Sequence, residues 1–158
     1  MLIDVHSHLD HDYFKDDLDE VIENAKKAGV KVILTAGINP KTNRKSLELA
    51  ERYEIVRPCL GIYPVQYENN NNHGNNEKTI KKITINNKNS NNKLYIDEEL
   101  KFIEKNKNKI IGIGEVGLDY SSAENNIEEQ KLQFEKIIHL AEKLSKPIII
   151  HSRKAENE

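Results

Sequence analysis

The order of apolar and amphipathic segments along the chain is the strongest constraint on its fold. Short apolar runs occur at residues 2–6, 30–35, 55–61, 110–115 and 147–151. Segments with the helical spacing of apolar residues lie between them, at residues 16–28, 40–53, 96–106 and 127–144. Apolar strands that alternate with helices are typical of a parallel sheet buried under helices. The sequence therefore predicts an α/β fold.

Two α/β architectures have this order, an open doubly wound sheet and a (βα)8 TIM barrel. A doubly wound sheet usually has a glycine-rich phosphate turn after its first strand, but this chain has His6-Ser7-His8 there. Histidines and an acid also lie at the carboxyl ends of the first, fourth and fifth strands, where barrel active sites are assembled. These placements favour the barrel. A complete barrel needs about 250 residues, so we expect a partial barrel of about the first five βα units.

An incomplete barrel has open sheet edges and an exposed apolar interior. We therefore expect residues 1–158 to form a single incomplete barrel domain, as a fragment would, and to be prone to association through the open edge. Residues 69–92 interrupt this domain with eleven Asn in 24 positions. This low-complexity, Asn/Lys-rich composition predicts a disordered insertion in a surface loop. The alternative is a basic arm that follows a phosphate backbone, but the segment has no aromatic residues that would stack on bases.

Charge, cysteine content and hydropathy exclude several classes of protein. A formal net charge of −2 gives no general attraction for polyanions. The single cysteine, Cys59, has no partner for an internal disulfide and fits a reducing compartment. No apolar run approaches the roughly 20 residues of a membrane span, and the amino terminus lacks the pattern of a secretory signal. We expect an intracellular protein, cytoplasmic or nuclear, with no membrane partner.

The strand ends carry side chains typical of metal ligands. His6 and His8 lie two residues apart, so on a β-strand both rings point to the same face. Two imidazoles form half of a divalent-metal site, although a solvated pair near a terminus is the alternative.

Glu115 follows two glycines, which we expect to let the chain turn sharply as it leaves the strand. A carboxylate there can bridge two ions, or else cap a helix or pair with a lysine. His151 ends the fifth strand and is either a further ligand or a hydrogen-bonded core histidine.

Other polar residues near these ends have less defined roles. Asp119 is expected either to orient a ligand or to form an Asx turn. Arg153 follows His151 and either binds a phosphate oxygen of a substrate or is solvated. Cys59 is expected to pack in the third strand. Three further histidines are expected to be structural or solvated: His11, His73 and His139.

Four segments in this order resemble the TatD family of metal-dependent deoxyribonucleases. They are residues 6–8 (HSH), 61–64 (GIYP), 114–120 (GEVGLDY) and 147–153 (PIIIHSR). The resemblance implies a TIM barrel of the metallo-dependent hydrolase type that hydrolyses phosphodiester bonds of a DNA substrate. It also implies two divalent metal ions (Mg²⁺, Zn²⁺ or Mn²⁺), with ligands matching His6, His8, Glu115 and His151, and with Glu115 as the bridging ligand.

The chain departs from the family pattern in two respects. The family has a further histidine after strand six and a general-base aspartate after strand eight, and the 158 residues include neither. We therefore expect full activity to need carboxyl-terminal residues outside this chain. Tyr63 also stands where many relatives have histidine, which we expect to alter substrate contacts without removing a ligand.

Two other functions fit the same residues. The chain is alternatively a catalytically inert partial barrel with a binding or structural role, which self-associates through its open edge. The ligand set also fits a different metallohydrolase, for amide or lactone hydrolysis. The segment 114–120 makes this last reading the less favoured of the three.

Overall fold

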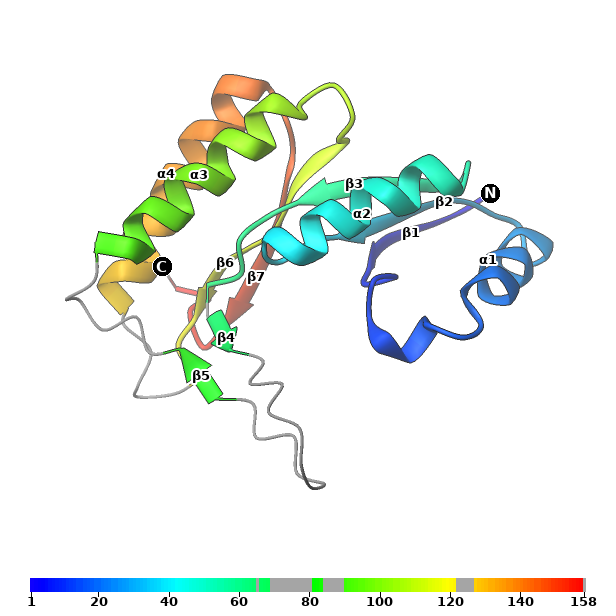
Figure 1. Ribbon diagram of the computed structural model, residues 1–158, viewed down its shortest axis with the longest axis horizontal. Helices are drawn as coiled ribbons and strands as arrows, with labels where there is room; N and C mark the ends of the chain where they lie inside the picture. Colours follow the sequence, from blue (N-terminus) through cyan, green and yellow to red (C-terminus); the bar gives the residue numbers. More distant parts are fainter. Residues whose placement is uncertain (65, 69–80, 84–89, 122–126, 158) are drawn as a thin grey trace.

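Five parallel strands form one curled sheet. A computed structural model describes residues 1–64, 66–68, 81–83, 90–121 and 127–157. The strand order is β1-β2-β3-β6-β7, and every neighbouring pair is parallel. The strands are β1 (Leu2–Ser7), β2 (Val30–Ala36), β3 (Val56–Leu60), β6 (Gly112–Asp119) and β7 (Ile148–Arg153). All five predicted strands and their parallel pairing are confirmed, and the sheet follows the curvature of a partial barrel (Figure 1).

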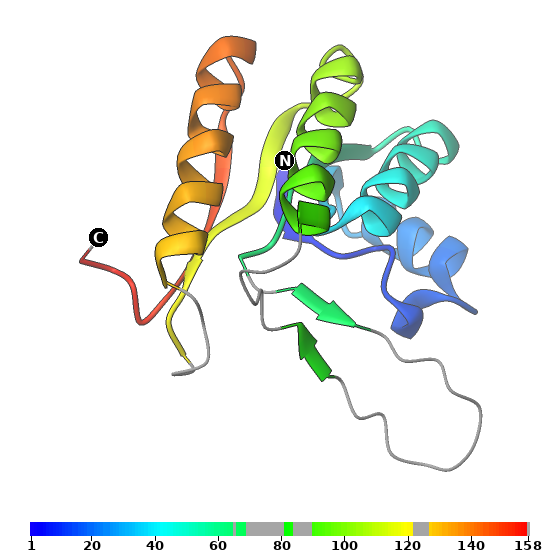
Figure 2. The same ribbon diagram turned by 60° about the vertical axis from the view of Figure 1, so that its left-hand side comes forward.

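Within the described residues, four α-helices alternate with these strands and pack against the sheet or one another (Figure 2). They are α1 (Leu18–Lys27), α2 (Pro40–Arg52), α3 (Ser90–Lys105) and α4 (Ile127–Leu144), and a short 3-10 helix covers Asp12–Phe14. Helix α2 begins with a reciprocal cap, in which Asn39 and Thr42 each accept a hydrogen bond from the backbone of the other, and Pro40 stands at its first turn. The predicted bounds of α4 are confirmed, whereas α3 begins six residues before its predicted start at residue 96.

The core consists of two apolar clusters on the helical side of the sheet. The larger one joins β3 and β6 to α3 and α4, and it includes Leu60, Ile103, Ile113 and Ile137. The smaller one joins β2 and β3 to α1 and α2, and it includes Ile22, Ile33, Leu49 and Val56. Both clusters hold the central strands rigidly, so the strand ends that carry polar side chains have defined positions.

The first strand differs from its prediction as a buried strand. In β1 the residues Leu2, Ile3 and Val5 are 56%, 48% and 64% exposed. The reason is that β1 pairs only with β2 and lies at one edge of the sheet. The opposite edge is β7, where Ile150 is 62% exposed. The expectation of open edges with exposed apolar side chains therefore agrees with the structure.

A two-stranded antiparallel sheet, β4 (Gln66–Glu68) with β5 (Lys81–Ile83), lies apart from the main sheet (Figure 1). It was not predicted. Most of the predicted insertion at residues 69–92 lies outside the described residues, and only β5 and the start of α3 fall within it. Among the residues that are described, no helix is both long and apolar enough to cross a membrane.

Candidate metal centre

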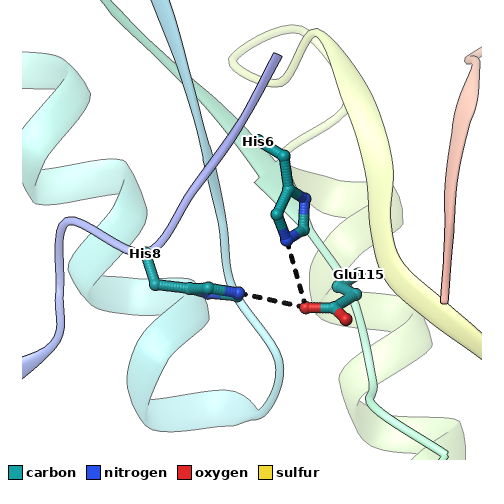
Figure 3. A group of neighbouring side chains, drawn as sticks. All are labelled: His6, His8 and Glu115. Carbon is teal, nitrogen blue, oxygen red and sulfur yellow. Dashed lines mark hydrogen bonds and ion pairs between the residues drawn. The ribbon is translucent and has the colours of Figure 1, made fainter. Parts of the chain in front are cut away.

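The carboxylate of Glu115 is the meeting point of side chains from three strands. His6 on β1 and His8 just beyond its end both point at Glu115 on β6 (Figure 3). Their Nε2 atoms lie 3.4 Å and 3.0 Å from Oε2 of Glu115. On the other side, Nδ1 of His151 on β7 lies 2.8 Å from Oε1. The four predicted ligand residues are therefore brought together, and they divide between the two oxygens of one carboxylate.

The ring of His8 is held in the orientation that a metal ligand needs. Its Nδ1 lies 2.9 Å from the carbonyl oxygen of Ala36, at the end of β2. A carbonyl oxygen only accepts hydrogen bonds, so Nδ1 carries a proton. Nε2 then donates to Glu115 when the ring is protonated, and in the neutral ring its lone pair is available to a cation held between it and the carboxylate. Histidine ligands in metalloproteins are fixed in the same way, by a hydrogen bond at the other ring nitrogen.

The charges at the site favour a cation between the imidazoles and the carboxylate. The hydrogen bond to Glu115 raises the pKa of His8, although partial burial opposes this effect. Burial raises the pKa of Glu115, but the hydrogen bond from His8 and the charges of all three imidazoles outweigh burial, and the net pKa is lowered. Glu115 is therefore a carboxylate at neutral pH, and it stabilises a proton on His8 or a metal ion held among the neighbouring rings.

The distances among the donor atoms fit a divalent ion. One donor atom from each of His6, His8 and Glu115 lies within 4.8 Å of the others. Tetrahedral coordination with bonds of about 2.1 Å separates neighbouring ligand atoms by about 3.4 Å. The observed separations from Oε2 of Glu115, 3.4 Å and 3.0 Å, are close to that value. These three residues therefore form a set of donors that suits one ion.

The backbone around Glu115 differs from the predicted turn. Strand β6 continues to Asp119, so Glu115 lies inside the strand and not at its exit. The register with β7 shifts between Ile113 and Val116, and Gly114 has a φ of +144°. A Cβ at Gly114 would lie 2.6 Å from the carbonyl oxygen of Ile149 on β7. The prediction of a sharp exit turn was therefore wrong, because β7 continues to pair with β6 beyond Glu115, and the glycine serves an irregularity within the strand.

Asp119 forms the Asx turn that the sequence left open, and its second carboxylate oxygen faces His151. Its Oδ1 accepts a hydrogen bond from the backbone N–H of Ser121 at 2.9 Å, which is an Asx turn. Its Oδ2 lies 3.4 Å from Nε2 of His151. Burial raises the pKa of Asp119, but the hydrogen bonds from Ser121 and His151 outweigh it, so the net pKa is lowered and the side chain is an anion facing the imidazole.

The remaining predicted residues have separate positions. Arg153 is exposed at the end of β7, so its side chain is accessible from solvent. His11 accepts a hydrogen bond from the backbone of Tyr13 in the 3-10 helix, and His139 is exposed on α4, as expected for a structural and a solvated residue. Cys59 is 1% exposed in β3, which confirms its packing, and burial raises its pKa to about 11. His73 lies outside the described residues.

Two buried glutamines of α4 were missed. Gln130 exchanges two hydrogen bonds with the backbone of Asp119, at 2.8 Å and 3.0 Å. Gln133 donates to the carbonyl oxygens of Ile62 and Tyr63, at 3.1 Å and 3.2 Å. They lie three residues apart, so they share one face of the helix. The sequence feature that could have identified them is their spacing: two glutamines stand three residues apart within the most apolar of the described helices.

Comparisons with known proteins agree with this geometry. A model of the TatD related DNase family matches residues 3–158. Human "Deoxyribonuclease TATDN3" is 35% identical over 159 residues, covering 98% of this chain and 53% of the human protein. The Bacillus subtilis "Uncharacterized metal-dependent hydrolase YabD" is 30% identical over 160 residues, covering 100% of this chain and 53% of its own length.

A solved structure shares the fold. The crystal structure of YJJV, a TatD homologue from Escherichia coli K12, superposes with a TM-score of 0.76 at 24% identity, covering 99% of this chain and 52% of that one. The chain thus spans about half the length of the curated relatives it matches. With a family match over nearly all of its residues and the curled parallel sheet of a TatD-type barrel, the chain belongs to the TatD related DNase family.

Proposed function

We propose that this chain carries the metal-binding part of a divalent-metal-dependent hydrolase that cleaves phosphodiester bonds of DNA. The observation that carries the proposal is the division of ligands around Glu115: Oε2 faces His6 and His8, and Oε1 faces His151. One carboxylate with imidazoles at both oxygens suits two ions, with Glu115 as the bridging ligand. Such ions, when bound, supply an activated water and neutralise charge on a phosphodiester.

Residues of the chain would hold the two ions and orient the substrate. His6, His8 and Glu115 would hold one ion, and Glu115 and His151 the other. Arg153, exposed at the end of the strand that carries His151, would contact a phosphate oxygen of the substrate. Imidazole and carboxylate ligands suit Zn²⁺ or Mn²⁺, whereas sites that bind phosphate-containing substrates often use Mg²⁺.

The matched relatives are about twice as long as this chain, and the family pattern places a further histidine and a general-base aspartate after later strands. We propose that full activity needs those later residues, because a proton acceptor for the attacking water is part of this chemistry. The name of the human relative supports DNA as the substrate, and the name of the Bacillus subtilis relative supports metal dependence. An intracellular location remains a prediction.

Metal binding tests the proposal most directly. Calorimetric titration of the chain with Zn²⁺ or Mn²⁺ is expected to show two ions per chain, and Glu115→Gln is expected to weaken binding roughly 10–100-fold or more, since it removes the charge shared by both positions. Glu48→Gln is the matched control, because the Glu48 side chain is 64% exposed on α2. Equal affinities for the Glu115→Gln variant and the parent chain would remove Glu115 from the site.

The catalytic part of the proposal needs a cleavage assay. Single-stranded and duplex DNA are incubated with Mg²⁺, Mn²⁺ or Zn²⁺ and a form of the protein that includes the later barrel strands. Glu115→Gln is expected to lose most of the turnover, while Glu48→Gln keeps it. Turnover that persists in the Glu115→Gln variant would place the chemistry elsewhere.

The exposed sheet edges favour a second candidate function, a partial barrel that associates with a second copy of itself. Leu2, Ile3 and Val5 on β1 are about half exposed or more, as is Ile150 on β7. An uncovered edge with apolar side chains is a template for pairing. Sedimentation of the 158-residue chain is expected to show a dimer that Val5→Lys dissociates; a stable monomer at high concentration would rule this function out.

A further inference from the structure

The ring of His151 has a defined partner at each nitrogen. Nδ1 lies 2.8 Å from Oε1 of Glu115. Nε2 lies 3.0 Å from the hydroxyl oxygen of Tyr63 and 3.4 Å from Oδ2 of Asp119. The hydroxyl is the closer of these two partners of Nε2, and it also lies 3.4 Å from the Asp119 carboxylate. The hydroxyl oxygen, the imidazole nitrogen and the buried carboxylate oxygen therefore form a triangle in which the shortest side joins Tyr63 to His151.

One assignment of protons satisfies all of these contacts when a cation binds at Nδ1. Nε2–H donates to the Tyr63 oxygen, and the Tyr63 hydroxyl donates to Asp119, since a hydroxyl can accept and donate at once. The ring then presents a lone pair at Nδ1 toward Glu115. This is the mirror image of His8, in which Nδ1–H is bound by the carbonyl oxygen of Ala36 and Nε2 faces the other oxygen of Glu115.

The position of the Tyr63 hydroxyl is itself constrained by the fold. The Tyr63 and His151 rings pack at a centroid distance of 4.6 Å and an interplanar angle of 54°. The backbone N–H of Tyr63 donates to the carbonyl oxygen of Ile38 at 3.0 Å, and its own carbonyl oxygen accepts from the buried Gln133. The backbone of Asp119 is held by Gln130, one turn earlier on the same helix. Helix α4 thus holds both residues that face Nε2.

We infer that Tyr63 is a positioning residue that orients His151, so that Nδ1 and Glu115 Oε1 form the second cation position. The inference rests on the proposed function for the identity of that position. Partners that orient a metal-bound histidine typically contribute 10–100-fold to metal affinity. Removing the hydroxyl should therefore weaken the ion held by His151 and leave the ion held by His6 and His8 unchanged.

The test compares Tyr63→Phe with Tyr13→Phe, which removes a hydroxyl from a residue that is 82% exposed. In calorimetric titration with Zn²⁺, Tyr63→Phe is expected to raise the Kd of the second ion roughly 10–100-fold and to keep that of the first. Tyr13→Phe is expected to leave both constants unchanged. Two unchanged constants in Tyr63→Phe would overturn the inference.

A second readout does not depend on metal. In the metal-free chain, the ¹⁵N resonance of His151 Nε2 is expected to shift in Tyr63→Phe, because the hydroxyl is its closer neighbour in either tautomer. The resonances of the exposed His139 should not move. An unshifted Nε2 resonance overturns the role of Tyr63. If the parent chain binds no ion, the proposed function fails, and this resonance still decides whether Tyr63 orients His151.

Discussion

Replacement of Asn43 by alanine tests how the structure holds the strand end that leads to Tyr63. Asn43 on α2 is fully buried, and its amide spans the gap between β3 and α3. Nδ2 donates to the carbonyl oxygen of Gly61 at 3.0 Å and to Oε1 of Glu99 at 2.7 Å. Oδ1 accepts from the N–H of Gly61 at 3.0 Å. One side chain therefore pairs both backbone groups of a buried glycine.

The magnitude follows from the groups that the variant leaves without partners. Each buried donor or acceptor that loses its hydrogen bond costs about 1–3 kcal/mol. Asn43→Ala leaves two such groups on Gly61, whereas Glu99 keeps Arg44, whose Nη1 lies 2.6 Å from both carboxylate oxygens. Water that enters the space of the lost amide restores part of this loss. We expect a decrease of about 2–4 kcal/mol in the free energy of unfolding, or roughly 4–16 °C in Tm.

Urea unfolding followed by circular dichroism measures this decrease. Asn24→Ala is the control, because Asn24 is exposed on α1, and its effect is expected to stay within about 0.5 kcal/mol. The slope of unfolding free energy against urea should be the same in all three proteins, which shows that the folded and unfolded states are comparable. A loss below about 1 kcal/mol for Asn43→Ala would refute the reasoning, since it would mean that Gly61 does not depend on this amide.

Three further predictions concern the thiol, a glycine and the metal. Burial raises the pKa of Cys59 to about 11, so its alkylation at pH 8 should be roughly 100-fold slower in the folded than in the urea-unfolded chain; equal rates would contradict the burial. Gly117 has a φ of +142°, and a Cβ there would collide with the carbonyl oxygen of His151. Gly117→Ala should therefore lower Tm clearly more than Gly29→Ala, where a Cβ meets no atom within 4 Å; similar melting curves would argue against a close approach of β6 and β7. Zn²⁺ at 100 times its Kd should stabilise the chain by about 2.7 kcal/mol, with full reversal by a chelator and a clearly smaller effect on Glu115→Gln; a Tm that Zn²⁺ does not raise would count against the site.

Local pattern was enough to predict much of this protein. The alternation of apolar strands and amphipathic helices predicted five parallel strands, and the apolar stripe of residues 127–144 predicted the bounds of α4. The spacing of His6 and His8 predicted that their rings share one face, and both face Glu115 in the structure. These features depend on the two-residue period of a strand and the 3.6-residue period of a helix, which the sequence contains directly.

The convergence of distant residues was decided only by the tertiary structure. β1 and β6 are separated by two strands, so in a flat sheet they would lie about 14 Å apart. The curl of the sheet brings His8 to 3.0 Å from Glu115, and no local pattern specifies that curvature. Packing against α4 likewise decides that Tyr63 and Asp119 meet at His151, and the pairing of β7 along β6 decides that Glu115 lies within its strand. The sequence determined which side chains each strand presents, whereas the curvature and packing of the whole sheet determined which of them meet.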